Sequence, residues 1–324
     1  MKRVLTLLAL LFSPVGVLAA APFPLDDAVP GGVAVVELPE SAATPQVEYS
    51  GQRMMVVRHA GHWYALVGLS LDTVPGEKAL DILVAGDATL HVAFSVMPKS
   101  YPEQALTIAD PQMVNPSPEQ LARIDKEQQR MAKVMGQWRK TPRPGISFVW
   151  PVKGPETSAF GLRRVLNGEP RSPHSGIDIG APAGTPALAP ADAVVADIGN
   201  YYYCGKTLTL DMGQGLFSVY CHLSRIKVNV GQKVKRGQLV GKVGATGRTT
   251  GPNLHWTVRL NEVPVDPHVF LGKNSPTPPP VTPPPPATML PPAQATAPAA
   301  TSSAAPPMAT RAAPAAATGS VTPL

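Results

Sequence analysis

Apolar residues recur at every second position over most of the interior of this chain, and glycine, proline and aspartate interrupt the runs. Such alternation is typical of half-buried β strands, which place successive side chains on opposite faces. Segments of this kind fill residues 31–112 and return after residue 148, for example in "KTLTLDMGQGLFSVYCHL" and "LHWTVRL". The pattern predicts a mainly β fold, with a small N-terminal β domain and a second, compact antiparallel β domain.

One segment between the two β blocks has a helical period instead. Residues 117–120 read Ser-Pro-Glu-Gln, which is a capping box with proline at the first helical position. Apolar side chains follow at three- and four-residue spacing, namely Leu121, Ile124, Met131, Met135 and Trp138. We therefore expect one amphipathic helix that packs its apolar stripe on a domain and ends in a linker at "TPRPG".

The two ends of the chain differ from its interior. Residues 1–20 combine two basic residues, a short apolar run and small residues, which is typical of a secretory signal peptide; a membrane anchor is the alternative. Almost all residues beyond 273 are Pro, Ala, Thr or Ser, which favours a disordered tail. The expected divisions are a signal peptide (1–20), an N-terminal β domain (21–112), a helix and linker (113–147), the second β domain (148–272) and the tail (273–324).

A signal peptide implies export, to the periplasm or cell envelope or into the medium, with no membrane span after its cleavage. Residues 146–273 carry 14 Lys and Arg against 8 Asp and Glu. Outside the cytoplasm, a basic domain favours an anionic envelope polymer over nucleic acid as its partner. The alternative is that the excess charge serves solubility alone.

The two cysteines also fit an oxidising compartment, where disulfides persist. A short turn within "MGQG" would place Cys204 opposite or diagonal to Cys221 on two paired strands. We expect a disulfide between them, and two small buried thiols are the alternative.

Four polar residues of the second domain are spaced like a metal site. His174 and Asp178 lie four apart in "PHSGIDIG", His222 ends a strand in "VYCHLS", and His255 follows Asn253 in "PNLHW". Three protein ligands of the His, Asp, His type leave one position of a tetrahedral zinc open, as in catalytic zinc sites. Such a zinc would favour amide hydrolysis. The alternative is a turn hydrogen bond between His174 and Asp178 and an unrelated strand histidine.

Three stretches in this order, "HSGIDIGAPAGTPALAPADAVV", "YCHLS" and "GQKVKRGQLVGKVGATGRTTGPNLHW", resemble the lysostaphin-like (LytM-type) zinc metallopeptidases of peptidoglycan. The resemblance covers residues 148–272. It implies a compact antiparallel β domain with one Zn²⁺ in a narrow groove and peptidoglycan cross-links as substrate. It also implies His174, Asp178 and His255 as zinc ligands and His222 as a catalytic histidine.

The resemblance departs from the family at Asn253, where a second catalytic histidine is expected. An amide cannot take and return a proton, although its NH₂ can donate to an oxyanion. We therefore expect a zinc endopeptidase slowed by Asn253. The alternative is an impaired relative that binds peptidoglycan or activates another wall hydrolase. The N-terminal domain is a candidate contact for an envelope protein and a candidate cover for the groove.

Overall fold

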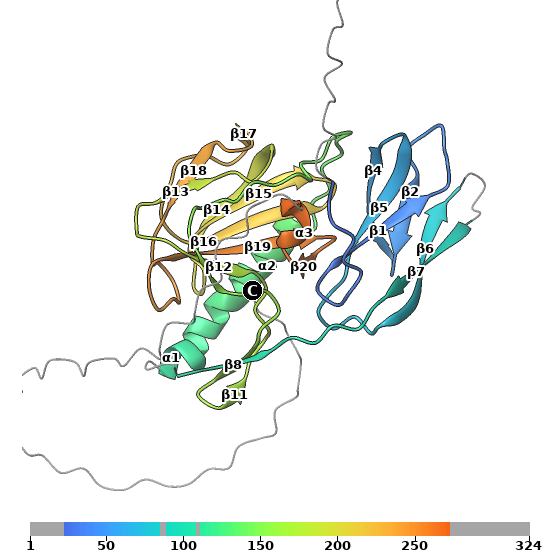
Figure 1. Ribbon diagram of the computed structural model, residues 1–324. Coiled ribbons are helices and arrows are strands. Elements are labelled where there is room, and N and C mark those ends of the chain that lie inside the picture. Colours follow the sequence, from blue (N-terminus) through green and yellow to red (C-terminus); the bar gives the residue numbers. More distant parts are fainter. Residues whose placement is uncertain (1–22, 85–88, 108–110, 273–324) are drawn as a thin grey trace, which may run out of the picture.

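The computed structural model describes residues 23–84, 89–107 and 111–272 (Figure 1). The expected mainly β class is confirmed: an N-terminal β region, one long helix and a large antiparallel sheet follow one another. The predicted signal peptide and the tail fall outside the described residues. Among the described residues, no helix has both the length and the apolar character needed to cross a bilayer.

The N-terminal region folds into two small antiparallel sheets, drawn in blue to cyan in Figure 1. Their strand orders are β1-β5-β4 and β3-β2-β6-β7. A buried cluster that includes Trp63, Leu80 and Val96 lies within this region. The strands are β1 (Val33–Leu38), β2 (Gln46–Tyr49), β3 (Gln52–Arg53), β4 (Met55–His59), β5 (His62–Gly68), β6 (Gly76–Leu83) and β7 (Thr89–Val96).

The connecting segment contains β8 (Glu103–Leu106), α1 (Pro111–Val114) and α2 (Pro118–Met135). The predicted capping box is confirmed, because the Gln120 N–H donates to the Ser117 hydroxyl at 3.3 Å and the Gln120 side chain accepts from the Ser117 N–H at 2.8 Å. This reciprocal pairing satisfies two donors at the helix N-terminus.

The predicted apolar stripe of α2 is wrong at both ends. Leu121 is 51% exposed. Trp138 lies beyond the end of the helix, where the guanidinium of Arg53 stacks 4.6 Å from its ring centre. The buried side chains of α2 are Ile124, Met131, Val134 and Met135.

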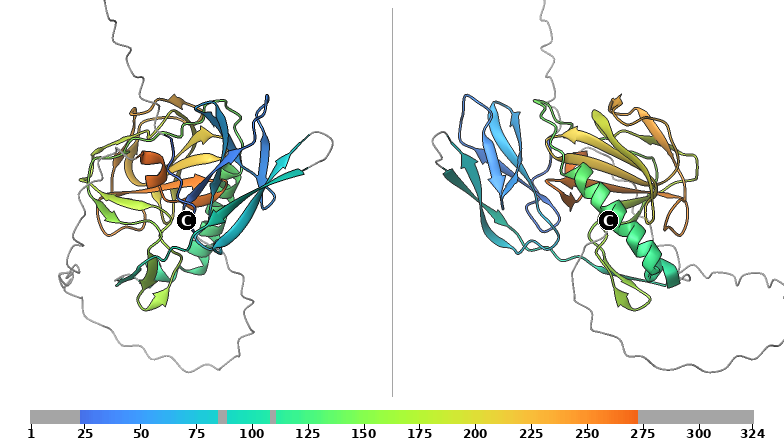
Figure 2. Two further views of the ribbon diagram at one scale, coloured as in Figure 1. Left: turned by 45° about the vertical axis from the view of Figure 1, so that its right-hand side comes forward. Right: turned by 180° about the vertical axis from the view of Figure 1, so that it is seen from behind.

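The second β region is built on one large sheet with the order β17-β14-β15-β16-β19-β12-β9. Helix α2 runs across one face of this sheet, as the view from behind in Figure 2 shows. There Met131 and Met135 pack against Phe217 and Val219. The elements are β9 (Glu156–Ser158), β12 (Ile177–Gly180), β13 (Pro186–Leu188), β14 (Ala193–Tyr201), β15 (Gly205–Gly213), β16 (Leu216–Ile226), β17 (Lys233–Val234), β18 (Leu239–Val243), β19 (Asn253–Leu260), β20 (Val263–Val265) and α3 (His268–Leu271).

A third, smaller sheet joins the two halves of the chain. The hairpin of β10 (Arg163–Leu166) and β11 (Glu169–Pro170) is extended by β8, which pairs with β10 in parallel. Figure 1 shows this sheet at the bottom of the molecule, below the large sheet. The second β region therefore receives one strand from the segment that precedes α2.

The two β regions also share a hydrophobic core. One cluster contains Trp256, Ile177 and Phe148 of the second region together with Met55 and Leu66 of the first. Two polar side chains reinforce this contact. Gln214, at the turn between β15 and β16, accepts a hydrogen bond from the Val56 N–H at 3.0 Å, and Asn261 donates to the Arg53 carbonyl at 3.1 Å.

Candidate metal centre

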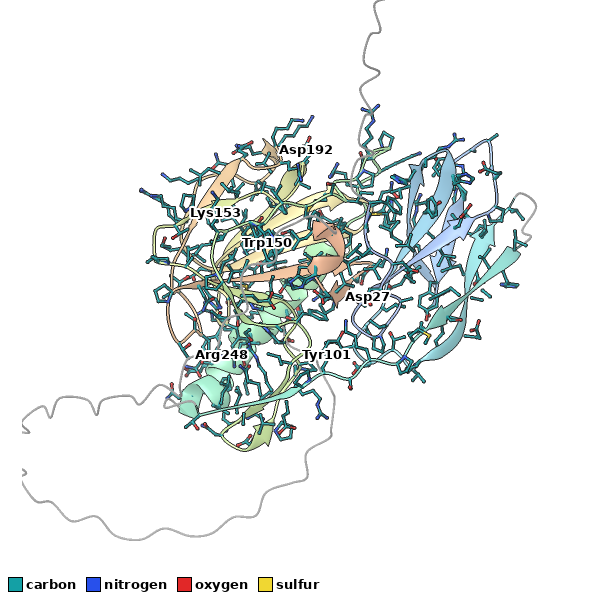
Figure 3. The ribbon with its side chains drawn as sticks, viewed as in Figure 1. Asp27, Tyr101, Trp150, Lys153, Asp192 and Arg248 are labelled. Carbon is teal, nitrogen blue, oxygen red and sulfur yellow. A yellow bond between two sulfur atoms is a disulfide. The ribbon has the colours of Figure 1, made fainter. Side chains whose placement is uncertain are left out.

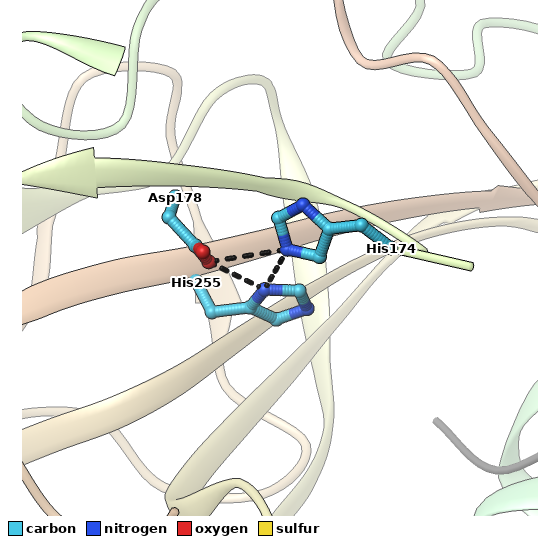
Figure 4. Close-up of side chains that lie close together, drawn as sticks. All are labelled: His174, Asp178 and His255. Atoms are coloured by element: carbon cyan, nitrogen blue, oxygen red, sulfur yellow. Dashed lines mark hydrogen bonds and ion pairs between the residues drawn. The ribbon is translucent and has the colours of Figure 1, made fainter. Parts of the chain in front are cut away.

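Three of the predicted site residues meet at one point between β12 and β19 (Figure 4). The antiparallel register sets Asp178 of β12 directly opposite His255 of β19. His174 comes from the loop just before β12, where its N–H donates to the Leu162 carbonyl at 2.9 Å. The loop and the strand register together therefore bring the side chains into contact.

The donor atoms of these side chains form a small triangle. Asp178 Oδ1 lies 2.8 Å from His255 Nδ1 and 3.2 Å from His174 Nε2, and the two ring nitrogens are 3.0 Å apart. Ligand atoms of a tetrahedral zinc, bound at about 2.0–2.2 Å, are about 3.3 Å apart. The observed spacing is close to that value, so the triad is arranged to face a single ion.

The remaining ring nitrogens of the triad are held by neighbouring groups. His174 Nδ1 is 2.7 Å from the Ala159 carbonyl oxygen, which can only accept, so Nδ1 donates to it and Nε2 is the nitrogen that faces the triad. His255 Nε2 is 2.9 Å from the Thr257 hydroxyl. Such outer hydrogen bonds fix the tautomer and the orientation of metal-binding imidazoles.

Asp178 has a third side-chain partner, which the sequence motif did not reveal. Its Oδ2 accepts a hydrogen bond from Arg164 of β10 at 3.3 Å. Burial raises the pKa of the Asp178 carboxyl, but the charges and hydrogen bonds of His174 and His255 outweigh this effect and hold the pKa well below its usual range. Burial lowers the pKa of His255, and Asp178 partly opposes that change. Asp178 is therefore an anion beside two imidazoles, and one carboxylate with two imidazoles is a donor set that suits Zn²⁺.

His222 lies beside the triad, with its ring centre 6.1 Å from that of His255. It occupies an irregularity of β16 and has a left-handed backbone, with φ of 63°. Its Nδ1 is 2.8 Å from the Thr246 carbonyl oxygen and must donate to it, so Nε2 is a proton acceptor. Burial, and then the charge of His255, lowers the pKa of His222 to about 4. His222 is consequently a neutral base at pH 7.

Asn253 lies on β19 two residues before His255, but its amide is used to hold a loop. Its Nδ2 donates to the Thr249 hydroxyl at 2.8 Å and to the Gly251 carbonyl at 3.2 Å. Its Oδ1 is buried and has no hydrogen-bond partner among the described residues. Both amide protons are thus engaged, which leaves no donor on Asn253 for an oxyanion in this conformation.

Cys204 and Cys221 form a disulfide, with their Cα atoms 4.6 Å apart. The strand positions expected for them are only half right. Cys204 lies in the turn between β14 and β15, and its carbonyl accepts from the His222 N–H at 2.7 Å. The disulfide and this hydrogen bond therefore tie the turn to the end of β16 that carries His222.

Comparison with known proteins places this site in a described family. A model of Peptidase family M23 matches residues 172–267, and a model of the Peptidase family M23 N-terminal domain matches residues 26–99. The crystal structure of a putative peptidase M23 from Pseudomonas aeruginosa is 41% identical in sequence, with a TM-score of 0.64. The match covers 76% of this chain and 95% of that chain.

Two curated relatives each match a part of this chain. Peptidoglycan DD-endopeptidase ShyA of Vibrio cholerae is 42% identical over 95 residues, which is 29% of this chain and 22% of the relative. Cell division protein DipM of Caulobacter vibrioides is 36% identical over 131 residues, which is 38% of this chain and 21% of the relative. The match therefore spans about a fifth of the length of these curated relatives.

Proposed function

Because the chain belongs to peptidase family M23, we propose that it is a zinc-dependent endopeptidase that hydrolyses peptide cross-links of bacterial peptidoglycan. The observation that carries this proposal is the triangle of His174, Asp178 and His255, whose donor atoms are spaced to hold one cation. Relatives named peptidoglycan DD-endopeptidases support the substrate class.

In this proposal the triad residues hold the ion, and His222 accepts the proton that water gives up. When bound, a zinc ion supplies Lewis-acid polarisation of a carbonyl and a lowered pKa for water. The bond from Nδ1 to Thr246 leaves Nε2 of neutral His222 as an acceptor, and this ring lies 6.1 Å from that of His255, where Nε2 can take a proton from water. Arg164 and Thr257 keep Asp178 and His255 in position.

A second candidate function is favoured by one observation, the use of both Asn253 amide protons to hold the loop of residues 249–251. A site with no second donor or imidazole loses about 10²–10³ in rate if an oxyanion contact is missing. The alternative is therefore an impaired relative that binds peptidoglycan or activates another wall hydrolase. One relative is named a cell division protein rather than an endopeptidase, which is consistent with this alternative.

The deciding experiment measures bound zinc and muropeptide release on the same purified protein. We expect one zinc per chain, slow release by the unmodified protein, and loss of release in His222→Ala with the zinc retained. His91→Ala is the control, because His91 is exposed on β7. Absence of zinc from the unmodified protein would contradict the proposal of a zinc-dependent enzyme. Zinc without release, with release restored by Asn253→His, would favour the impaired relative.

We propose that the chain is exported and acts in the periplasm or cell envelope. We also retain the division into residues 1–20, 21–112, 113–147, 148–272 and 273–324 as a proposal, with residues 21–112 as the contact for an envelope protein. Fractionation of cells that express a tagged chain tests the location. Recovery with the cytoplasmic fraction would contradict it.

A further inference from the structure

The ladder between β15 and β16 is interrupted at the position of His222. Lys206 of β15 is the register partner of Leu223 on β16. The next pair along the strands is Leu208 with Tyr220, so two residues of β16 lie opposite one residue of β15. A bulge of this kind bends the strand and changes the direction of a side chain. The left-handed backbone of His222, with φ of 63°, is part of it. The bulge therefore determines where the imidazole lies.

A threonine hydroxyl from another loop bridges the two strands at this bulge. The Lys206 N–H donates to Thr246 Oγ1 at 2.9 Å, and the same hydroxyl donates to the Leu223 carbonyl at 2.9 Å. Because Lys206 and Leu223 are register partners, the hydroxyl links an N–H of β15 to a C=O of β16 across the interrupted ladder. The side chain of Thr246 therefore ties β15 and β16 together next to His222.

The backbone of the same threonine holds the imidazole. His222 Nδ1 donates to the Thr246 carbonyl at 2.8 Å, and the His222 N–H donates to the Cys204 carbonyl at 2.7 Å. The ring is thus fixed through Thr246, and the main chain is fixed through the turn that carries the disulfide. Because the hydroxyl sets where Thr246 lies relative to both strands, it also sets the position of the carbonyl that His222 meets.

Two glycines let the loop of Thr246 approach the turn before β15. A Cβ atom on Gly205 would lie 2.3 Å from the Thr246 carbonyl carbon, and one on Gly247 would lie 2.3 Å from the Gly205 nitrogen. Both glycines have positive φ, 62° and 75°, which side chains disfavour. The Arg248 N–H then donates to the Tyr203 carbonyl at 2.8 Å, and Figure 3 labels Arg248. The loop is therefore seated directly on the turn.

Thr246 is not one of the residues grouped around the metal position. That group consists of His174, Asp178 and His255. Both hydrogen bonds of the Thr246 hydroxyl described above go to backbone atoms of β15 and β16. A change of this hydroxyl should therefore alter the position of His222 and leave the zinc content of the protein unchanged.

We infer that Thr246 is the positioning residue of His222. Its hydroxyl keeps the bulge of β16 in place, and its carbonyl holds the imidazole proton on Nδ1, which leaves Nε2 as the acceptor. This inference rests on the proposed endopeptidase function, in which His222 accepts a proton from water. Thr246 acts through His222 in this arrangement and has no contact of its own with the reacting atoms.

The test measures hydrolysis of one cross-linked muropeptide by zinc-loaded protein. Thr246→Val keeps the shape of the side chain but lacks the hydroxyl. Its kcat should fall about 10- to 100-fold, because a small misplacement of a catalytic group costs up to about 10²-fold. KM should change little, since the lost contact serves the transition state rather than substrate binding. Thr246→Ser keeps the hydroxyl and should retain most of the rate.

Thr141→Val is the matched control, because it removes a hydroxyl far from His222. Thr141 Oγ1 accepts from the Arg143 N–H at 3.3 Å. The Thr141 carbonyl accepts from Gln214 at the turn between β15 and β16, whereas His222 lies towards the other end of β16. Its kcat should equal that of the unmodified protein. Circular dichroism and zinc content verify each variant, and Thr246→Ala replaces Thr246→Val if the latter does not fold.

Nitrogen NMR of the imidazoles at pH 7, with the His222 signals assigned from His222→Ala, separates this inference from the proposed function. The unmodified protein should carry the His222 proton on Nδ1, and folded Thr246→Val should show a mixture of both neutral forms. If the unmodified protein cleaves no muropeptide, the endopeptidase proposal fails, and the spectra still test the position of His222.

Three results would overturn the inference. They are an unchanged His222 spectrum in folded Thr246→Val, a kcat of that variant equal to the kcat of Thr141→Val, and a loss of rate in Thr246→Ser as large as in Thr246→Val. A loss of kcat in Thr246→Val that serine restores, with zinc retained and the His222 spectrum altered, supports it.

Discussion

The Thr257 hydroxyl lies behind the metal centre, at the nitrogen of His255 that faces away from the triad. Because an outer hydrogen bond fixes the imidazole and raises its basicity, Thr257→Val should weaken zinc binding about 10- to 100-fold. Competition with a metal chelator measures this affinity. Thr185→Val, which removes a hydroxyl bonded to the Pro182 carbonyl in a distant turn, is the matched control. Equal affinities for both variants would contradict the role given to Thr257.

His222 gives a prediction about pH. Its folded pKa of about 4 lies below the ordinary value near 6.5, so the neutral base persists as the pH falls to about 4. We therefore expect kcat/KM for muropeptides to stay level between pH 7 and pH 5, where an ordinary histidine would be mostly protonated. Zinc content measured at each pH separates protonation of His222 from loss of the metal. A tenfold loss of rate by pH 5 with zinc retained would refute the assignment.

The sequence motif identified His174, Asp178, His222 and His255, because their spacing along the chain is itself the signal. It could not identify Arg164 or Thr257, whose contacts depend on strand register and on which face each side chain takes. The engagement of Asn253 by its own loop was equally hidden, because it depends on the closed path of residues 249–251.

At the scale of elements, α3 is anchored through its first residue. His268 Nδ1 is 2.7 Å from Asp266 Oδ1, and Nε2 is 3.0 Å from Glu156 Oε2 on β9. Burial lowers the pKa of His268, but the hydrogen bonds and charges of Asp266 and Glu156 outweigh it and raise the pKa to about 10. The charged imidazole therefore links α3 to the edge of the large sheet.

A folded pKa above the unfolded value of about 6.5 stabilises the protein fully below pH 6.5, and this contribution disappears as the pH rises through about 10. His268→Gln should thus lower the free energy of unfolding more at pH 6 than at pH 10, as measured in urea. His91→Gln, at an exposed position of β7, should cause little change at either pH. A His268→Gln effect of the same size at both values would argue against the ion pairs.

The elements themselves were predictable to different degrees. The capping box at Ser117 is local and gave the start of α2. The parallel pairing of β8 with β10 was not foreseen, because it joins residues about sixty positions apart and no local pattern encodes it. The disulfide partners were foreseen, but the turn that carries Cys204 was not.

The whole molecule depends on α2 as a cover for the large sheet. Met131 and Met135 bury Phe217, Val219 and the disulfide, and Arg130 pairs with Asp197. Compared with a chain of residues 111–272, a chain of residues 146–272 should therefore be less stable by at least about 3 kcal/mol, the value for burying one to two large apolar side chains. Urea unfolding of the two chains measures the difference. Equal midpoints would mean that α2 is dispensable.

The position of α2 ahead of the sheet it covers has a consequence for biosynthesis. Ribosomes add about 5–20 residues per second, so roughly 4–16 s pass between the synthesis of α2 and that of Phe217, against which its apolar face packs. Until then Met131 and Met135 have no partner from β16 and are exposed to chaperones or to other chains. Arrested chains ending near residue 200 should bind a hydrophobic dye that chains ending at 272 exclude. The nascent chain therefore keeps these apolar side chains exposed until β16 has been synthesised, although the finished fold buries them.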